Sequence, residues 1–311
     1  MKVKAYLGTI FANYRIIIIT FIVYYKTVYS MNEPKKVVLV PWDFTEGSEI
    51  ALKHAIQLAE VSDNDILLLH IIPNTWFMRI IGRKTTSPQE VDALTKRLEK
   101  IAEDISNEIK VYVFAMVLEG NPTNLIRELI TTANLNLIAA YKTYTYGKKK
   151  LESGYFMRRL SVKNLNIPFL IAEEPPVHDH YIEIVVPMDY DKRYKETLHW
   201  IIYLSKYYKC NINLIKPYIS DEGKKRNMAN NLYFTKKMLD GNKIVYGIKT
   251  AKRKNVFSDE VKKFAANIEA DLILIMADKY KTYTRADKNQ KYSKVPIMWI
   301  TPRLRKLSGF N

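Results

Sequence analysis

The chain has 311 residues and carries 49 Lys+Arg against 32 Asp+Glu, which gives a formal net charge of +17. That length suits two domains, and 48% hydrophobic with 26% charged residues excludes a disordered chain and a multi-span membrane protein. The one cysteine, Cys210, excludes an internal disulfide framework and a cysteine-based zinc finger. It also suits a reducing compartment, so we expect a cytoplasmic protein.

The first 34 residues are predicted to be an extension outside the native fold. Their apolar run, Ile16 to Tyr25, is about half as long as a membrane-spanning helix requires, and a poor cleavage site follows it. A membrane anchor or signal peptide is the alternative. We favour translation from Met31, because the next residues lead directly into a strand.

Residues 35–173 alternate short apolar runs with longer stretches of helical period. Strands are predicted near 36–41, 65–72, 110–117, 136–140 and 168–172. Helices are predicted near 46–61, 88–108, 121–133 and 152–165. Because the strands are continuous apolar runs, helices should cover both faces of the sheet, as in a parallel, doubly wound α/β layer.

The second half of the chain repeats the first. VVLVPWDFTEGSEIALKHAI aligns with EIVVPMDYDKRYKETLHWII at a constant offset of 146, which relates Pro41 to Pro187 and Asp43 to Asp189. Both halves contain Tyr-Lys-Thr-Tyr-Thr after an apolar strand, and both close on a proline-led apolar strand. The predicted organisation is domain 1 at 35–173, a linker at 174–180, domain 2 at 181–303 and a basic tail at 304–311.

The opening of each half is similar to the universal stress protein family. The likeness implies two tandem doubly wound α/β domains, each with a mostly parallel five-stranded sheet in the order 3-2-1-4-5. Nucleotide-binding members hold ATP or a related nucleotide at the carboxyl ends of strands 1 and 4, where an open α/β sheet leaves a crevice. The likeness implies that Pro41 and Asp43 meet the adenine or ribose, and that His70 to Ile72 lie along the base.

Phosphates in such members lie on a glycine loop after strand 4. That loop needs close backbone approach and free N–H donors at a helix N-terminus. The alignable positions here are Ala140, Lys142, Thr143, Ser153 and Gly154, so both leading glycines are replaced. Lysines 148–150 could compensate with positive charge, or could simply be solvated. An adenine nucleotide is therefore expected, if anywhere, in domain 1.

The second crevice is predicted to have lost its ligand. Asp278 stands where the loop should begin and would repel phosphate, and no glycine lies between Gly247 and Gly309. Asp189 is therefore a weaker ligand candidate than Asp43. Either aspartate could instead cap the helix that follows it, although Thr45 and Asp191 are also available as caps.

Histidines and short motifs give no evidence of an active site. His54 and His199 are expected in helix–sheet packing, and His178-Asp179-His180 is expected to be surface chemistry in the linker. No metal site is predicted. The usual nucleophile, zinc, dinucleotide and phosphate-loop motifs are missing, so we do not predict an enzyme.

Two further functions compete with nucleotide binding. In the first, the protein is a ligand-free interaction or dimerisation module for an unknown protein partner, its crevices filled by side chains such as Tyr141 and Tyr144. In the second, the basic second half binds nucleic acid. This is the less favoured alternative, and we predict neither nucleic acid nor a membrane as the partner. The family likeness, in which strand 5 is often the dimer-forming edge, also implies that the two fifth strands pair within one chain as a pseudo-dimer, with a homodimer as a further possibility; such pairing would cover an otherwise exposed edge. The apolar segment Trp76 to Ile81 could cover the crevice or contact a partner, or fold back on the sheet.

Overall fold

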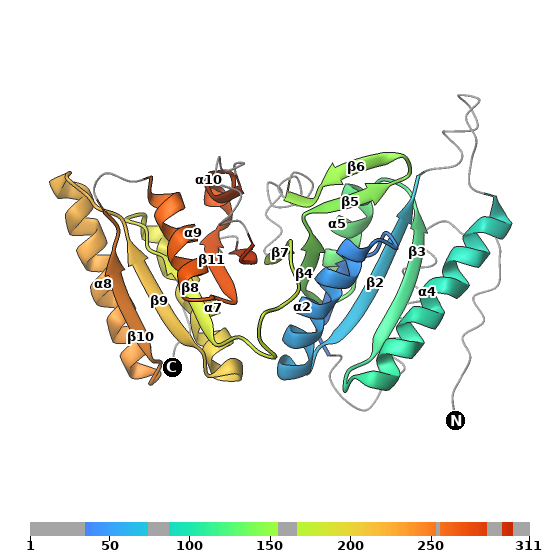
Figure 1. Ribbon diagram of the computed structural model, residues 1–311, viewed down its shortest axis with the longest axis horizontal. Helices are drawn as coiled ribbons and strands as arrows, with labels where there is room; N and C mark the ends of the chain where they lie inside the picture. The colour runs from blue at the N-terminus through green and yellow to red at the C-terminus, as the bar shows by residue number, and fades with distance from the viewer. Residues whose placement is uncertain (1–34, 74–86, 155–166, 253–255, 285–293, 301–311) are drawn as a thin grey trace.

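The computed structural model describes residues 35–73, 87–154, 167–252, 256–284 and 294–300. Their strands form one ten-stranded sheet and one separate two-stranded hairpin (Figure 1). The N-terminal extension, the segment Trp76 to Ile81, most of the helix predicted at 152–165 and the basic tail lie outside the described residues. No helix among those described is long and apolar enough to cross a membrane.

The first half contributes strands to the sheet, helices on both of its faces, and the hairpin. Its strands in the large sheet are β1 (Val37–Pro41), β2 (Asp65–Ile72), β3 (Val113–Glu119), β4 (Leu135–Tyr141) and β7 (Phe169–Ala172). Its described helices are α2 (Glu46–Ser62), α4 (Pro88–Glu108) and α5 (Pro122–Thr132). The hairpin consists of β5 (Thr143–Tyr146) and β6 (Lys149–Glu152).

The second half repeats this arrangement with smaller connections. Its strands are β8 (Glu183–Pro187), β9 (Asn211–Lys216), β10 (Tyr246–Thr250), β11 (Leu272–Met276) and β12 (Ile297–Ile300). Its described helices are α7 (Lys195–Tyr208), α8 (Glu222–Gly241), α9 (Phe257–Asn267) and α10 (Tyr280–Thr284), with 3-10 turns η1 (Lys192–Tyr194) and η2 (Ala277–Lys279).

The predicted strand order 3-2-1-4-5 is confirmed in both halves. The sheet runs β10-β9-β8-β11-β12-β7-β4-β1-β2-β3. Within each half every strand pairing of this ten-stranded sheet is parallel. Pro41 lies opposite Leu69 and Pro187 lies opposite Ile215, so the sequence offset of 146 is preserved in the sheet register.

The halves join through their fifth strands. β7 and β12 pair antiparallel, with Leu170 opposite Met298 and Phe169 opposite Trp299. The Phe169 and Trp299 rings also meet edge to face, 5.5 Å between centroids. This is the pairing that the sequence analysis expects, and it covers two edges that would otherwise be exposed.

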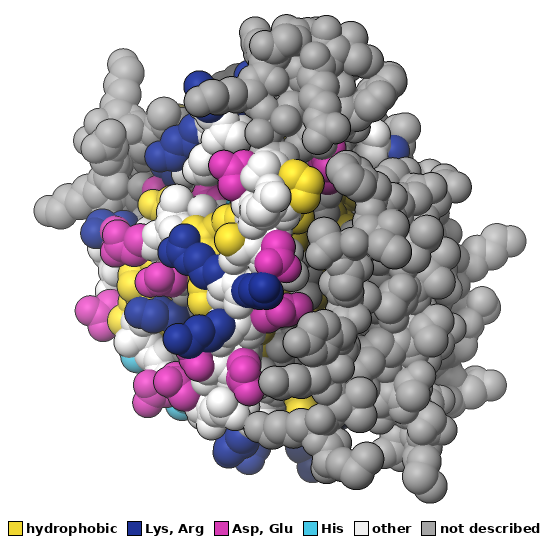
Figure 2. Space-filling model, turned by 90° about the vertical axis from the view of Figure 1, so that its right-hand side faces the viewer, with side chains coloured by type: hydrophobic (Ala, Val, Ile, Leu, Met, Phe, Trp, Pro, Cys, Tyr) yellow, Lys and Arg dark blue, Asp and Glu magenta, His cyan; other side chains and the backbone are white. Residues whose placement is uncertain are grey.

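Helices cover both faces of the continuous sheet. Buried side chains of α2, α4, α7 and α8 form one apolar core, and those of α5 and α9 form a second core on the opposite face. The fold is therefore doubly wound in each half, as predicted. At the outer end of the first half, around α4, basic and acidic side chains are interspersed (Figure 2).

Local sequence signals place α4 at its predicted bounds. The Ser87 hydroxyl accepts the backbone N–H of Glu90, the Glu90 carboxylate accepts the N–H of Ser87, and Pro88 begins the helix. The following strand was predicted at 110–117, but β3 spans Val113–Glu119. Its position depends on pairing with β2, where Ile66 lies opposite Val113, and not on local composition.

The sequence analysis expected surface chemistry at His178 but did not identify its partner, which is Asp271. His178 Nδ1 lies 2.6 Å from Oδ1 of Asp271, and Oδ2 of the same carboxylate accepts the backbone N–H groups of Ile182 and Glu183. Asp271 directly precedes β11 and is only 5% exposed. The histidine thereby attaches the linker to the second half.

This pair makes stability depend on pH. The hydrogen bond that His178 donates to the Asp271 carboxylate raises the pKa of His178 above its ordinary value, so the stabilisation is complete below about pH 6.5 and is lost as pH rises through the raised pKa. We expect the melting temperature of the wild type, relative to His178→Asn, to fall between about pH 6 and pH 8.

Taking the difference in melting temperature between the wild type and His178→Asn cancels the contribution of the other histidines. Burial lowers the pKa values of His54 and His70, which are present in both proteins. A melting-temperature difference that stays constant across this range would show that His178 carries no pH-dependent stabilisation.

Candidate functional site

The crevice at the carboxyl ends of β1 and β4 is the predicted site, and the β5–β6 hairpin lies across it (Figure 1). The stretch aligned with a phosphate loop is thus a hairpin, which corrects the sequence analysis. Its turn contains Gly147 at φ +58°, where a Cβ would lie 2.8 Å from the Pro73 ring. Glycine suits this turn because it adopts positive φ without strain and permits the close approach to β2.

Asp43 binds the hairpin. Its Oδ2 accepts the backbone N–H of Thr145 at 2.6 Å. Its Oδ1 accepts the hydroxyls of Ser48 and Thr45 at 2.6 and 2.5 Å, and the Thr45 N–H at 3.2 Å. Burial acts to raise the pKa of Asp43, but these hydrogen bonds outweigh it and hold the pKa below its usual value.

The sequence analysis gave Thr45 as an available cap for α2, which would leave Asp43 freer for a ligand. In the structure Thr45 stands at the N-cap position but its side chain makes no capping bond to the helix. Its hydroxyl donates to Asp43 instead. The carboxylate is ionised and already has several donors, all from the protein itself.

Tyr144 occupies the space along the end of β2. Its side chain is buried, and its hydroxyl accepts the backbone N–H of Ile71 at 3.0 Å. Burial raises the pKa of this phenol, so it stays neutral. Ile71 lies inside the segment His70 to Ile72 that the family likeness assigns to the nucleotide base. A ring of this protein thus contacts the strand where a bound base would lie.

Two neighbouring tyrosines, Tyr141 and Tyr146, make further contacts at this end of the sheet. Tyr146 donates its hydroxyl to the carbonyl of Gly120 after β3, at 2.8 Å. The Tyr141 ring packs on Gly47 at the start of α2, so closely that a Cβ at Gly47 would lie 2.4 Å from it. The hairpin therefore contacts the ends of β2 and β3 and, through Asp43, the residues after β1, while Tyr141 at the end of β4 packs on α2.

The remaining residues of the predicted base site contact other residues of the protein. His70 Nδ1 lies 2.7 Å from the Trp42 carbonyl, and its ring meets that of Phe44 at 4.9 Å. The Arg97 guanidinium lies over the Phe44 ring, 4.5 Å from its centroid. Pro41 and Ile72 are the last residues of β1 and β2.

The residues of the predicted phosphate site are separated by the hairpin. Ala140 is buried in β4, and Thr143 lies opposite Glu152 in the hairpin ladder. Lys142 forms an ion pair with Glu173 at 3.0 Å. The exposed lysines 148–150 lie in and after the hairpin turn.

Ser153 and Gly154 connect the hairpin to the second half. Ser153 is buried, and its N–H donates to the Lys142 carbonyl at 2.9 Å. Gly154 is approached by Tyr280, whose hydroxyl would lie 1.6 Å from a Cβ at this position. Glycine is required here by this packing, not by a phosphate.

The second crevice is filled by ion pairs. Lys279 binds Asp189 at 2.8 Å, and Arg193 binds both Asp191 at 2.6 Å and Asp278 at 3.0 Å. The Arg193 hydrogen bonds lower the pKa of Asp191 to about 2. Asn231 of α8 donates to the carbonyls of Asp189 and Asp191, which holds the loop in place.

Sequence reasoning named Tyr141, Tyr144 and Asp43 but missed Ser48, Thr145 and Tyr146. The available signal was the alternation Thr-Tyr-Thr-Tyr before Gly147, which is typical of a hairpin strand. Among the residues that the structure describes, no group of three or more His, Cys, Asp or Glu is placed to hold a metal ion.

Comparison with known proteins agrees with this architecture. Residues 35–148 match the model of the universal stress protein family. They are a universal stress protein domain. A universal stress protein of Methanocaldococcus jannaschii is 25% identical over 146 residues, 45% of this chain and 83% of that protein.

The structural likeness extends over both halves. A universal stress protein from Archaeoglobus fulgidus covers 86% of this chain and 98% of its own, at 15% identity and a TM-score of 0.58. A functionally unknown protein from Pseudomonas aeruginosa covers 86% and 93%, at 13% identity and a TM-score of 0.54. These identities show the fold alone, so the crevice of this universal stress protein domain must be interpreted from its own contacts.

Removing the Asp43 carboxylate should destabilise the domain. In Asp43→Ala, the Thr145 N–H and the Ser48 hydroxyl lose their acceptor, and we expect the free energy of unfolding in urea to fall by about 1–3 kcal/mol. Asp104→Ala, an exposed aspartate on α4, should change it by less than about 0.5 kcal/mol. Equal effects from the two substitutions would show that Asp43 does not hold the hairpin.

Proposed function

We propose that this protein is a universal-stress-type interaction module whose first crevice is closed by its own hairpin, so that it works without a bound nucleotide. The proposal depends on the position of Tyr144. Its hydroxyl accepts a hydrogen bond from the Ile71 N–H, at the position where the family likeness puts the nucleotide base. Asp43 supports it, because its carboxylate binds Thr145, Thr45 and Ser48 of the same chain.

A module of this kind would act through protein contacts of the joined halves. The ten-stranded sheet places both crevices in one continuous body, and each crevice is filled by a different chemistry. Tyrosine rings and a hydrogen-bonded aspartate fill the first, and the ion pairs around Arg193 fill the second. The two crevices are thus filled in two independent ways. This favours a protein whose function does not need a bound nucleotide.

Binding of ATP or a related adenine nucleotide in the first half is the second candidate. It is supported by family membership and by the exposed lysines 148–150 beside the hairpin turn. Nucleotide entry would require Tyr144 to leave the end of β2 and Asp43 to exchange the Thr145 N–H for a ligand group. The two candidates therefore make opposite predictions for the wild-type protein.

Thermal melting with ATP distinguishes them. A ligand that binds only the folded state raises the melting temperature. We expect no shift for the wild type at millimolar ATP, and no adenine nucleotide on the purified protein in native mass spectrometry. Tyr144→Ala should show a positive shift with ATP relative to the same variant alone, because the base position is then vacant.

Tyr112→Ala is the matched control, because Tyr112 is 59% exposed and lies before β3, outside the crevice. It should behave like the wild type. A wild-type shift that Asp43→Ala abolishes would establish nucleotide binding and refute the closed crevice.

A further inference from the structure

An approximate twofold axis relates the two halves. In the β7–β12 pairing, Phe169 lies opposite Trp299 and Ile171 opposite Ile297, on either side of the central pair Leu170–Met298. The pattern is symmetric about this pair, so β12 corresponds to β7 at an offset of 128 (298 − 170). Ile300, where β12 ends, therefore corresponds to Ala172.

The same axis relates side chains beside the junction. α2 and α7 correspond at an offset of 146, and their C-cap residues Asp63 and Lys209 both have left-handed backbones. His54 then corresponds to Trp200, and Gln57 corresponds to Tyr203.

The strands β4 and β11 supply a third equivalent pair. Leu137 lies opposite Val38, and Leu272 lies opposite Ile184, the residue 146 positions later. The residues that precede Leu137 and Leu272 are Asn136 and Asp271, which therefore correspond.

On the first side of the axis, all three positions bind the linker. His54 Nε2 lies 3.0 Å from the Glu174 carbonyl, and the Gln57 amide donates to the His178 carbonyl. Asp271 binds the His178 ring at 2.6 Å. The linker can cover only this side, because it runs once from β7 to β8.

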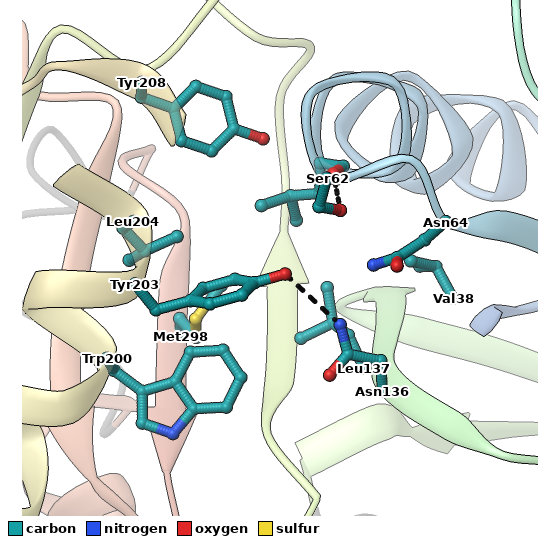
Figure 3. Close-up of a pocket in the computed structure, with 11 residues that line it drawn as sticks. Val38, Ser62, Asn64, Asn136, Leu137, Trp200, Tyr203, Leu204, Tyr208 and Met298 are labelled. Carbon is teal, nitrogen blue, oxygen red and sulfur yellow. Dashed lines mark hydrogen bonds between the residues drawn. The ribbon is translucent and has the colours of Figure 1, made fainter. Parts of the chain in front are cut away.

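On the second side, the three equivalents line a pocket. Trp200 and Tyr203 face it from α7, and Asn136 faces it from β4, with its amide 3.5 Å from the Tyr203 hydroxyl (Figure 3). Ser62 and Met298 also line it. The same positions that bind chain on one side of the axis thus surround a pocket on the other.

We propose that this pocket is the docking site of the chain's own carboxy-terminal segment, residues 301–311. These residues follow β12 as residues 173–183 follow β7, so the segment is long enough to repeat the course of the linker. The strand that leads into this segment lies at the pocket, because Met298 of β12 lines it.

The chemistry of the segment suits the pocket. It carries Arg303, Arg305 and Lys306. Ser62 and Tyr208, the last residues of α2 and α7, both line the pocket, and helix C-termini favour cations. The aromatic rings of α7 add faces on which an arginine can stack.

The shape of the pocket excludes a buried small molecule. Its empty volume is about 300 Å³ with the adjoining open solvent included, and inside it there is room for roughly one water molecule. A peptide that lies across the mouth and inserts a side chain fits this shape better than a ligand that must be enclosed.

Cross-linking in the full chain tests the docking. Tyr207, whose ring meets that of Tyr203 at 4.9 Å, is replaced by cysteine together with Lys306→Cys, and a short bismaleimide is added at pH 7. Burial raises the pKa of the native thiol Cys210 to about 11, so it should not react. We expect an intrachain cross-link, identified by mass spectrometry of the peptides.

The control pairs Lys306→Cys with Tyr233→Cys on α8, which is the more exposed site at 72% against 37% for Tyr207. Docking predicts a yield about fivefold higher for the Tyr207 pair, because it raises the local thiol concentration. Adding Arg303→Gln and Arg305→Gln should lower that yield. Equal yields at both sites, or cross-links only between two chains, would overturn the proposal, the latter by assigning the pocket to a second copy.

Discussion

The antiparallel pairing of β7 with β12 is the interaction on which the rest of the structure depends. It joins two five-stranded sheets into one sheet of ten strands and brings α2 beside α7, while the linker contacts α2. Without it, each half would expose the edge of its fifth strand, with unpaired backbone groups. The pairing is short, with three residue pairs given by the register. The Phe169–Trp299 contact and the linker reinforce it.

The crevices of the two halves are closed in different ways. In the first, backbone N–H groups that a ligand could use are satisfied by Asp43 and Tyr144 of the same chain. In the second, Lys279 and Arg193 neutralise the aspartates that remain. Both solutions obey the same constraint, since buried polar groups and charges must find partners. The closure of each crevice is therefore part of the stability of its half.

A covalently joined pair of halves is also less symmetric than a dimer of identical chains. The linker binds at His54 and Gln57, but one linker cannot bind at Trp200 and Tyr203 as well. The substitutions at the equivalent positions reflect this difference, because small polar donors on one side correspond to aromatic rings on the other. Asp271, which binds a histidine, likewise corresponds to the neutral Asn136.

Much of the fold could be predicted from the sequence, because its signals are local or periodic. The continuous apolar strands, the capping box at Ser87 and the constant offset of 146 together predicted the doubly wound halves, and the structure confirms the strand order. The register of β3 and the ion pair of His178 with Asp271 could not be predicted, because each depends on residues brought together only by folding. The occupancy of the first crevice was left open for the same reason.

One pentapeptide shows which features the sequence determines and which features the tertiary contacts determine. Tyr-Lys-Thr-Tyr-Thr begins at the last residue of the fourth strand in the first half and shortly after the fourth strand in the second, and identical residues have identical propensities. In the first half Thr143 to Thr145 belong to strand β5, because Gly147 permits a turn and β6 supplies the partner. In the second half Tyr280 to Thr284 form the helix α10, where Tyr280 packs against Trp299. The sequence alone determined that a fourth strand ends there; tertiary contacts decided between strand and helix, because only they supply a partner strand or a packing surface.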